Sequence, residues 1–159
     1  MIGGVELDII KQAHINGYLL AFSLINRRAN HGYTFEWKEL DFHDDILTAY
    51  KISFNLEIGE NLGDLRLIPI DDWKGKLGEV CDNWFFEVGY PFHKFDSSVK
   101  FDVNHCIQGF LKLITDFFEG DPTVYKVECE PNFWYEGIWD DFIFYYDKNL
   151  FLLHFGVSD

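Results

Sequence analysis

The sequence predicts an α+β fold, in which a largely antiparallel β-sheet carries two main helices packed on it. Three observations lead to this prediction. Apolar residues recur at helical spacing in 6–26 and 102–118, several runs between these segments alternate apolar with polar residues, and two apolar runs separated by a turn sequence follow. With 159 residues and no Pro-rich or repetitive linker, the chain is expected to fold as one domain over 1–159.

The first segments are expected to form a helix and then a strand. A helix is favoured from Glu6 to Asn26, although Asn16-Gly17 interrupts it and leaves residues 18–25 open between helix and strand. The apolar residues near helical spacing are Val5, Ile9, Ile10, Ala13, Leu20 and Leu24. Residues 33–37 alternate between aromatic and polar side chains, which predicts a short strand.

The middle of the chain is predicted to be rich in strands. After a polar loop at 41–45, the clearest alternation lies in 50–58 and predicts a strand with one buried and one solvated face. Its partner is expected at 65–70, where Pro69 indicates an edge strand or a strand end. A turn at 71–78 and a further strand at 84–90 are expected to follow.

A second helix is predicted to start at Asp102 or Asn104 and to end before 119–122. Its apolar stripe consists of Val103, Cys106, Ile107, Phe110, Leu111, Ile114, Phe117 and Phe118. The next strand is expected at 125–130. In it, Tyr125, Val127 and Cys129 should face the core while Lys126, Glu128 and Glu130 face solvent.

The runs 139–146 and 150–157 are predicted to form a β-hairpin around the turn Asp147-Lys148-Asn149. Both faces of this hairpin are apolar. In the first run Phe142, Phe144 and Tyr146 should point one way and Ile143 and Tyr145 the other; in the second run Leu150 and Leu152 should oppose Phe151, Leu153 and Phe155. A hairpin with one wet face would alternate apolar and polar residues, so this one is expected at the centre of the sheet with cover on both sides.

The chain is strongly acidic and its charge is unevenly distributed. The net charge is −14, and residues 81–159 carry 14 acidic and 5 basic side chains against 13 and 8 in residues 1–80. Such a field opposes direct binding to nucleic acid and to anionic membranes. It favours a cationic partner, or it serves solubility alone.

Cysteine usage indicates a reducing compartment. Cys81, Cys106 and Cys129 are odd in number and lack CxxC spacing, which is typical of free thiols in the cytoplasm. The N-terminal residues lack the basic region of a signal peptide, and no apolar run approaches the roughly 20 residues that span a bilayer. A cytoplasmic location without membrane contact is expected.

Motifs for catalysis or cofactor binding are not found in the sequence. A phosphate loop would need glycine five positions before Gly75, where Ile70 stands, and there is no GxSxG elbow. His105 and Cys106 are neighbours whose side chains diverge by about 100° on a helix, so Cys106 is expected to be a core thiol. Residues 43–45, His-Asp-Asp, lack a second histidine at metal-site spacing. No catalytic residue, metal or other cofactor is assigned.

Acidic doublets beside aromatic residues recur at 42–45, 70–73 and 138–141. One interpretation is that the carboxylates are solvated at strand ends while the tryptophans are buried. The other is an anionic surface with tryptophan anchors, a residue type common in interface hot spots, provided that the doublets share one end of the sheet. The candidate partner-binding residues are Asp44, Asp45, Asp71, Asp72, Trp73, Glu136, Trp139, Asp140 and Asp141.

Two further points concern the hairpin's polar residues. Asp140 and Asp141 are adjacent and should point to opposite faces of a strand, so they are not expected to act as a carboxylate pair in acid–base catalysis. His154 stands among apolar neighbours and is expected to be a hydrogen-bonded core imidazole. Functional roles for His43 and His154, including pH sensing, stay open.

The ending from Trp139 to Gly156 resembles the endings of small bacterial immunity proteins from polymorphic toxin and contact-dependent growth inhibition systems. The resemblance covers about twenty residues and carries no invariant motif. It implies a cytoplasmic, non-enzymatic protein that binds a cognate toxin domain, often a basic nuclease, and blocks its active site. Two alternatives stay open: a small-ligand-binding domain or enzyme with an aromatic pocket, and a homo-oligomeric or structural subunit.

Overall fold

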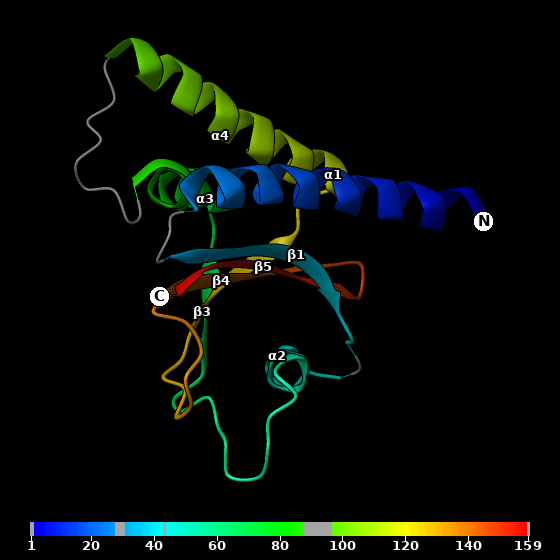
Figure 1. Cartoon of the computed structure of the whole chain (residues 1–159). Helices are drawn as coiled ribbons and strands as arrows, with labels where there is room; N and C mark the ends of the chain where they lie inside the picture. The colour runs from blue at the N-terminus through cyan, green and yellow to red at the C-terminus, as the bar shows by residue number, and fades with distance from the viewer. Residues whose placement is uncertain (1, 28–30, 43, 88–96, 159) are drawn as a thin grey trace.

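The computed structural model describes residues 2–27, 31–42, 44–87 and 97–158, with side chains described for 8–27, 31–42, 44–86 and 103–158. The fold is α+β, as predicted (Figure 1). The strands are β1 (Gly32–Leu40), β2 (Arg66–Ile70), β3 (Thr123–Glu128), β4 (Ile138–Tyr146) and β5 (Asn149–Ser158). The helices are α1 (Ile2–Asn26), α2 (Ile46–Ser53), α3 (Trp73–Asp82), the short π-helix η1 (Asn83–Glu87) and α4 (Ser97–Phe117).

The predicted hairpin lies inside the sheet. The strand order is β1-β5-β4-β3-β2 and every neighbouring pair is antiparallel. The turn is shorter than predicted: Tyr146 pairs with Asn149, and Asp147 and Lys148 alone connect the strands. Both have positive φ, 46° and 63°, as the tight hairpin turn that matches strand twist requires.

Both faces of the hairpin are buried, as predicted, because helices cover the sheet on each side. Figure 1 shows α1, α3 and α4 above the sheet and α2 below it. The larger core contains Phe142, Phe144, Phe151, Leu153 and Phe155 with residues of α1, α3, η1 and α4. The smaller core contains Ile143, Leu150 and Leu152 with Ala49 and Tyr50 of α2.

The two ends of the sheet are distinct. The hairpin-turn end contains Asp147 and Lys148, and the antiparallel register brings Leu40 and Ile70 to the same end. The opposite end contains the start of β4 at Ile138, the end of β3 and the start of β2. These two ends carry different parts of the predicted acidic surface.

Helix α1 runs through Asn16-Gly17 without a break, so the favoured helical interpretation of 18–25 is confirmed. The Asn16 amide stays outside the helical ladder and bonds the edge strand: its Nδ2 donates to Trp37 O at 2.8 Å, and Trp37 N donates to its Oδ1 at 2.9 Å. This contact satisfies exposed backbone groups of β1. The predicted apolar face is wrong, because Ile15, Leu19 and Phe22 are buried. Ile9, Ile10, Leu20 and Leu24 are exposed.

The strand predicted at 50–58 is wrong, since α2 occupies residues 46–53. Asp45 accepts hydrogen bonds from the Thr48 N–H at 2.8 Å and from its hydroxyl, which starts the helix. The helix gives way to a turn at Asn55, whose φ is 47°. The apparent alternation therefore spans a helix and a turn, and its apolar members do not share a face: Tyr50 is buried while Ile58 is fully exposed.

The turn predicted at 71–78 and the strand predicted at 84–90 are wrong as well. Asp72 caps α3 by accepting from Gly75 N at 3.1 Å, so a helix forms despite two glycines. Residues 83–87 continue it as η1, and 88–90 lie outside the described residues. The edge position of Pro69 is confirmed, although β2 pairs with β3. The second helix is confirmed and begins earlier, at Ser97.

Candidate functional site

The candidate site lies at the opposite end of the sheet, where β3 and β4 separate. Their last backbone pair joins Val127 to Asp141, and the chain beyond β3 leaves the sheet before β4 begins. Segment 129–137 lies outside the sheet between β3 and β4. The chain returns to the sheet at Gly137, whose N–H donates to Val157 O at 2.9 Å. A pocket lies at this end of the sheet, lined by residues of β2, β3 and β4 and of the segments next to them.

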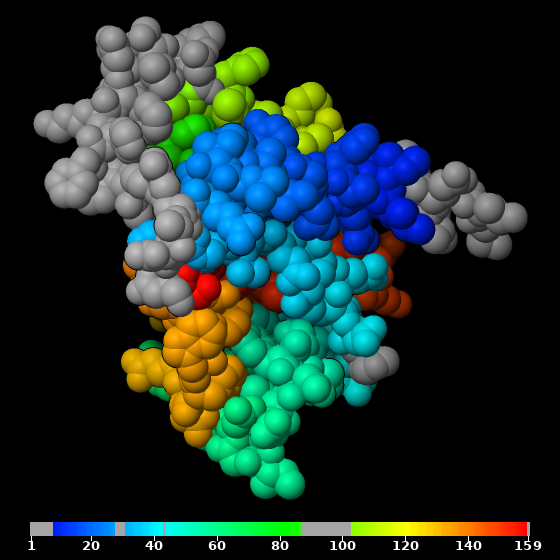
Figure 2. All heavy atoms as spheres, in the orientation of Figure 1, coloured from blue at the N-terminus to red at the C-terminus, as the bar shows by residue number. Residues whose placement is uncertain are grey.

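Segment 129–137 is held against the loop that follows α2. Glu130 N donates to Leu62 O at 3.1 Å, and Asn61 N donates to the Asn132 side chain at 2.7 Å. Gly63 allows this approach because its φ is 61° and a Cβ there would collide with the Glu130 carbonyl. Figure 2 shows the two segments side by side, orange and blue-green, at the bottom of the molecule.

The pocket has a volume of about 450 Å³, and its lining contains four acidic, two basic and three uncharged residues. It is lined by Asp64, Arg66, Lys126, Val127, Glu128, Cys129, Glu130, Trp139 and Asp140. Both cations already have an anionic partner: Arg66 pairs with Asp64, and Lys126 pairs with Asp140. Asp140 also accepts from Trp84 Nε1 at 2.8 Å. With Glu128 and Glu130, the carboxylates of the lining outnumber its two cations.

Two large apolar side chains near the start of β4 are exposed at this end of the sheet. Trp134, in segment 129–137, is 73% exposed, and Ile138 at the start of β4 is 59% exposed. Trp139 is half-buried and packs against Tyr135 with ring centroids 5.2 Å apart. We call this combination of pocket, Trp134 and Ile138 the acidic–aromatic surface.

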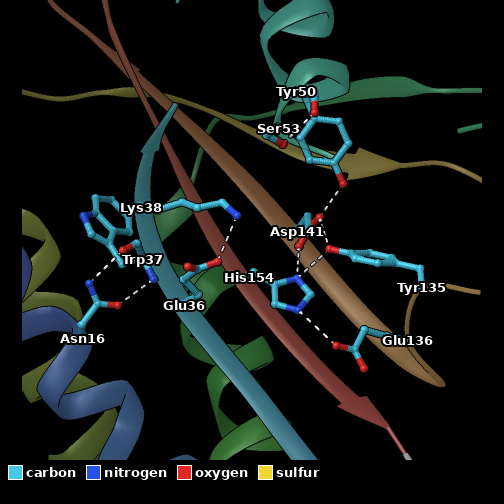
Figure 3. A network of polar contacts seen from close by, with 10 residues as sticks. All are labelled: Asn16, Glu36, Trp37, Lys38, Tyr50, Ser53, Tyr135, Glu136, Asp141 and His154. Carbon is cyan, nitrogen blue, oxygen red and sulfur yellow. Dashed lines mark hydrogen bonds and ion pairs between the residues drawn. The ribbon is translucent and has the colours of Figure 1, made fainter. Parts of the chain in front are cut away.

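A buried polar network lies directly behind this surface (Figure 3). The fully buried Asp141 carboxylate accepts from Tyr50 Oη and from Tyr135 Oη, the latter at 3.2 Å. His154, its cross-strand partner, lies with Nδ1 2.6 Å from Asp141 Oδ1. Because a carboxylate accepts, Nδ1 carries the proton in this contact. On the other side of the imidazole, Nε2 lies 3.9 Å from Glu136 Oε1.

Burial controls the proton affinities of this network. It raises the pKa of Tyr50 and of Tyr135 far above the ordinary phenol value, with the Asp141 charge adding to both shifts. Both hydroxyls therefore stay protonated and act as donors. Burial also raises the pKa of the Glu136 carboxyl, against smaller lowering effects of His154 and Thr34. The Cys129 thiol pKa rises to about 11, chiefly by burial and then by the Asp141 charge, which keeps it protonated.

The geometry of Asp141 and His154 is that of a carboxylate orienting an imidazole. In a catalytic pair the second imidazole nitrogen would face a nucleophile or substrate. Here it faces Glu136, and His154 is only 5% exposed. The expectation of a hydrogen-bonded core imidazole is confirmed. The network ties segment 129–137, through Tyr135 and Glu136, to the centre of the sheet.

The structure separates the predicted partner-binding residues into two groups. Glu136, Trp139, Asp140 and Asp141 lie together at the opposite end of the sheet, while the other two doublets lie at the hairpin-turn end. The three doublets therefore do not share one end.

Several members of these doublets have structural contacts. Asp45 and Asp72 cap α2 and α3. Trp73 is buried against Phe144, with ring centroids 5.5 Å apart. Asp140 and Asp141 point to opposite faces, as expected, and Asp141 contributes no exposed surface. Asp44 and Asp71 are exposed, and His43 lies outside the described residues.

Other members of the site were not predicted. Tyr50 was placed in the wrong element, and nothing in the sequence distinguishes the exposed Trp134 from its neighbours Phe133 and Tyr135. The register did carry a signal. With a two-residue turn at Asp147-Lys148, Asp141 and His154 become direct cross-strand partners, whereas the three-residue turn hides this pairing.

Searches against protein-family models, curated proteins and solved structures found no match for this chain. Among the residues that the structure describes, no helix is both long and apolar enough to cross a membrane. The described side chains include no group of three or more His, Cys, Asp or Glu residues placed to hold a metal ion. The function is therefore inferred from the site itself.

Proposed function

We propose that this protein is a cytoplasmic immunity protein, which binds a cationic toxin domain through the acidic–aromatic surface and blocks it. One observation carries the proposal: a pocket whose lining has more acidic than basic residues lies at the end of the sheet where the large apolar side chains of Trp134 and Ile138 are exposed. The free thiols of Cys81, Cys106 and Cys129 agree with a reducing compartment.

Electrostatics favours a basic partner. The pocket lining has four carboxylates against two cations, and two of these carboxylates, Glu128 and Glu130, are exposed, so the pocket carries a net negative charge. A net charge of −14 adds a long-range attraction, which speeds the encounter with a basic protein by about 10–10³-fold at low salt. Toxin nucleases need basic surfaces to hold nucleic acid, and such surfaces complement this one.

Trp134 and Ile138 would supply binding energy after the encounter. Large side chains that become fully desolvated dominate interface affinity, and tryptophan is the most enriched of them. The hydrogen bonds of segment 129–137 to the loop after α2, and its anchor on the buried network, hold Trp134 in place before binding. A preorganised segment loses less conformational entropy in the complex.

The test is affinity capture from the organism of origin with three tagged proteins. These are the unchanged chain, a surface variant with Glu128→Gln, Glu130→Gln and Trp134→Ala, and a control variant with Glu119→Gln and Asp121→Asn. The control removes the same charge near the hairpin-turn end. We expect one basic protein to bind the unchanged chain and the control in a salt-sensitive manner, and to be lost from the surface variant.

Toxicity supplies the second half of the test. The captured protein, expressed alone, should arrest growth, and co-expression of the unchanged chain should restore growth. A partner that binds all three proteins equally would place the interface elsewhere. A captured protein without toxicity would remove the immunity interpretation while keeping the binding surface.

The pocket volume favours a second candidate function. About 450 Å³ lies within the range of small-molecule sites, and the carboxylates with Trp139 would suit a small organic cation. Polyamines and amino-acid amides are suitable probes in a thermal-shift assay. Stabilisation that Glu128→Gln abolishes, without a captured protein partner, would favour this function over toxin binding.

A further inference from the structure

The outer face of α1 is apolar except for His14. Ile9, Ile10, Leu20, Leu24 and Ile25 are between 45% and 70% exposed. Ala13, Gly17 and Ala21 lie between them on the same exposed face. A helix on the surface of a globular protein normally turns charged and polar residues outward. Figure 2 shows this helix, in blue, across the upper front of the molecule.

Helix α4, in the same layer above the sheet, provides the contrast. Its exposed described residues are Asn104, His105, Gln108, Lys112 and Asp116. This face is polar throughout, as expected for a helix in contact with water. The apolar character of the outer face is therefore particular to α1, and a contiguous patch of this kind marks an interaction surface.

Gly17 lies at the centre of this face, and no contact within the described chain requires a glycine there. Glycine in a helix interior costs stability relative to alanine. A Cβ at Gly17 would meet no atom within 4 Å, and the backbone φ there is not positive. The missing side chain therefore serves no contact within the described chain. It would permit close approach of a second helix.

The residues on either side of Gly17 are arranged symmetrically. Ala13 and Ala21 lie four positions away on each side, Ile10 and Leu24 seven positions away, and Ile9 and Ile25 eight positions away. Three positions away the pair is unlike, with the exposed His14 on one side and Leu20 on the other. An antiparallel copy of the same helix, crossing at Gly17, would place small residues against small residues. It would also place the aliphatic residues of one end against those of the other. A two-fold interface requires this kind of self-complementarity.

Charge favours a second copy over a membrane. No acidic residue occurs between Asp8 and Glu36, although the chain carries a net charge of −14. Like-charge repulsion is therefore weakest where these two helices would meet. A bilayer with anionic lipid would repel the rest of the protein. Interfacial helices usually carry Lys and Arg residues along the length of their apolar face, whereas here the sequence has Lys11 alone within the helix and Arg27 and Arg28 just after its end.

We propose that two copies of this chain form a dimer in which the α1 helices pack antiparallel, with their crossing point at Gly17. The exposed fractions of the five large aliphatic residues add up to nearly three fully exposed side chains. At roughly 100 Å² each, two copies would bury about 600 Å² from these side chains alone. Stable interfaces begin near 1,000 Å², so we expect a reversible monomer–dimer equilibrium.

Sedimentation equilibrium over a wide concentration range tests the proposal with the full chain. We expect a monomer–dimer equilibrium whose Kd rises at least tenfold in Gly17→Leu and in Leu24→Glu. The control is Gln108→Glu, which adds the same charge as Leu24→Glu on the outer face of α4 and should leave Kd unchanged. Leucine is a good helix former, so Gly17→Leu keeps the helix while separating the two axes.

Gly17→Leu also distinguishes a specific dimer from nonspecific adhesion, because added apolar surface strengthens adhesion but weakens a close crossing. Under mild oxidation, Gly17→Cys should form a cross-linked dimer and Ile10→Cys should not, since only residue 17 meets its own copy. A monomer at every concentration would overturn the proposal. So would unchanged dimerisation in Gly17→Leu, or binding of the monomer to phosphatidylcholine vesicles. These results do not depend on whether a toxin partner is found.

Discussion

Removing the Tyr50 hydroxyl should destabilise the protein more than removing any neutral hydrogen-bond donor of similar burial. The hydroxyl donates to the Asp141 carboxylate, which has no access to solvent. Tyr50→Phe keeps the ring, its contact with Phe54 and the packing of α2, and deletes only the donor. The carboxylate then loses one of three partners in a site where water does not replace it.

The magnitude follows from the charge of the acceptor. A hydrogen bond to a charged group contributes about 1.5–3 kcal/mol, against about 0.5–1.5 kcal/mol for a neutral pair. Because Asp141 is fully buried, we expect Tyr50→Phe to cost about 2–3 kcal/mol. For a chain of this length, that lowers Tm by about 4–12 °C. Tyr18→Phe is the control for a neutral acceptor, since the hydroxyl of this less buried tyrosine donates to the Cys106 carbonyl at 2.6 Å.

Urea unfolding followed by tryptophan fluorescence measures both changes. Tyr18→Phe should cost about 1 kcal/mol. In an Asp141→Asn background the cost of Tyr50→Phe should shrink, because the charge that strengthens the bond is gone. Equal costs for Tyr50→Phe and Tyr18→Phe would refute the reasoning, since they would mean that Asp141 does not act as a buried anion.

Three further predictions concern the site and its supports. Gly63→Ala should cost more than about 1 kcal/mol in urea unfolding, because it combines a positive φ with a collision against the Glu130 carbonyl. Asp72→Ala should cost about 0.5–2 kcal/mol by removing a helix cap, whereas the exposed neighbour substitution Asp71→Ala should stay within about 0.5 kcal/mol. Burial raises the pKa of Glu136 above 4.5, so the folded chain holds this proton more tightly and the group's contribution to stability falls as pH rises above that value. Glu136→Gln should therefore gain stability relative to the unchanged chain as pH increases, and a difference independent of pH would contradict this origin.

The sequence predicted the elements whose pattern is set by burial on a regular period. The hairpin of β4 and β5 was found because both faces are apolar, and its placement at the sheet centre follows from the same fact. The alternation of apolar and polar residues at 50–58 predicts a strand, but the N-cap at Asp45 starts a helix before this segment. The hydrogen bond from Thr48 N to the Asp45 carboxylate stabilises the first turn of this helix. The apolar residues that follow alternate as in a strand but do not share one face.

The sequence predicted only some of the residues of the candidate site. Glu136, Trp139, Asp140 and Asp141 were selected, and the chain itself keeps them together. Tyr50 joins them because α2 packs on the lower face of the sheet. Its hydroxyl contacts Asp141, which lies 91 positions later in the chain. The outer face of α1 was missed for a different reason. Its apolar residues have helical spacing, and spacing alone does not tell whether a face meets the core of its own chain or something else.

The position of β5 has a consequence for the order in which the chain folds. Strand β1 joins the sheet only through β5, by pairs that run from Gly32–Ser158 to Leu40–Leu150 and connect residues at least 110 positions apart. Closing so long a loop is slow, and it comes late when the chain leaves the ribosome. Until Asn149–Ser158 is available, β1 lacks its partner strand and one edge of β4 is unpaired, which exposes strand edges prone to aggregation. A truncation before Asn149 would therefore abolish folding of the sheet and of the helices that pack on it.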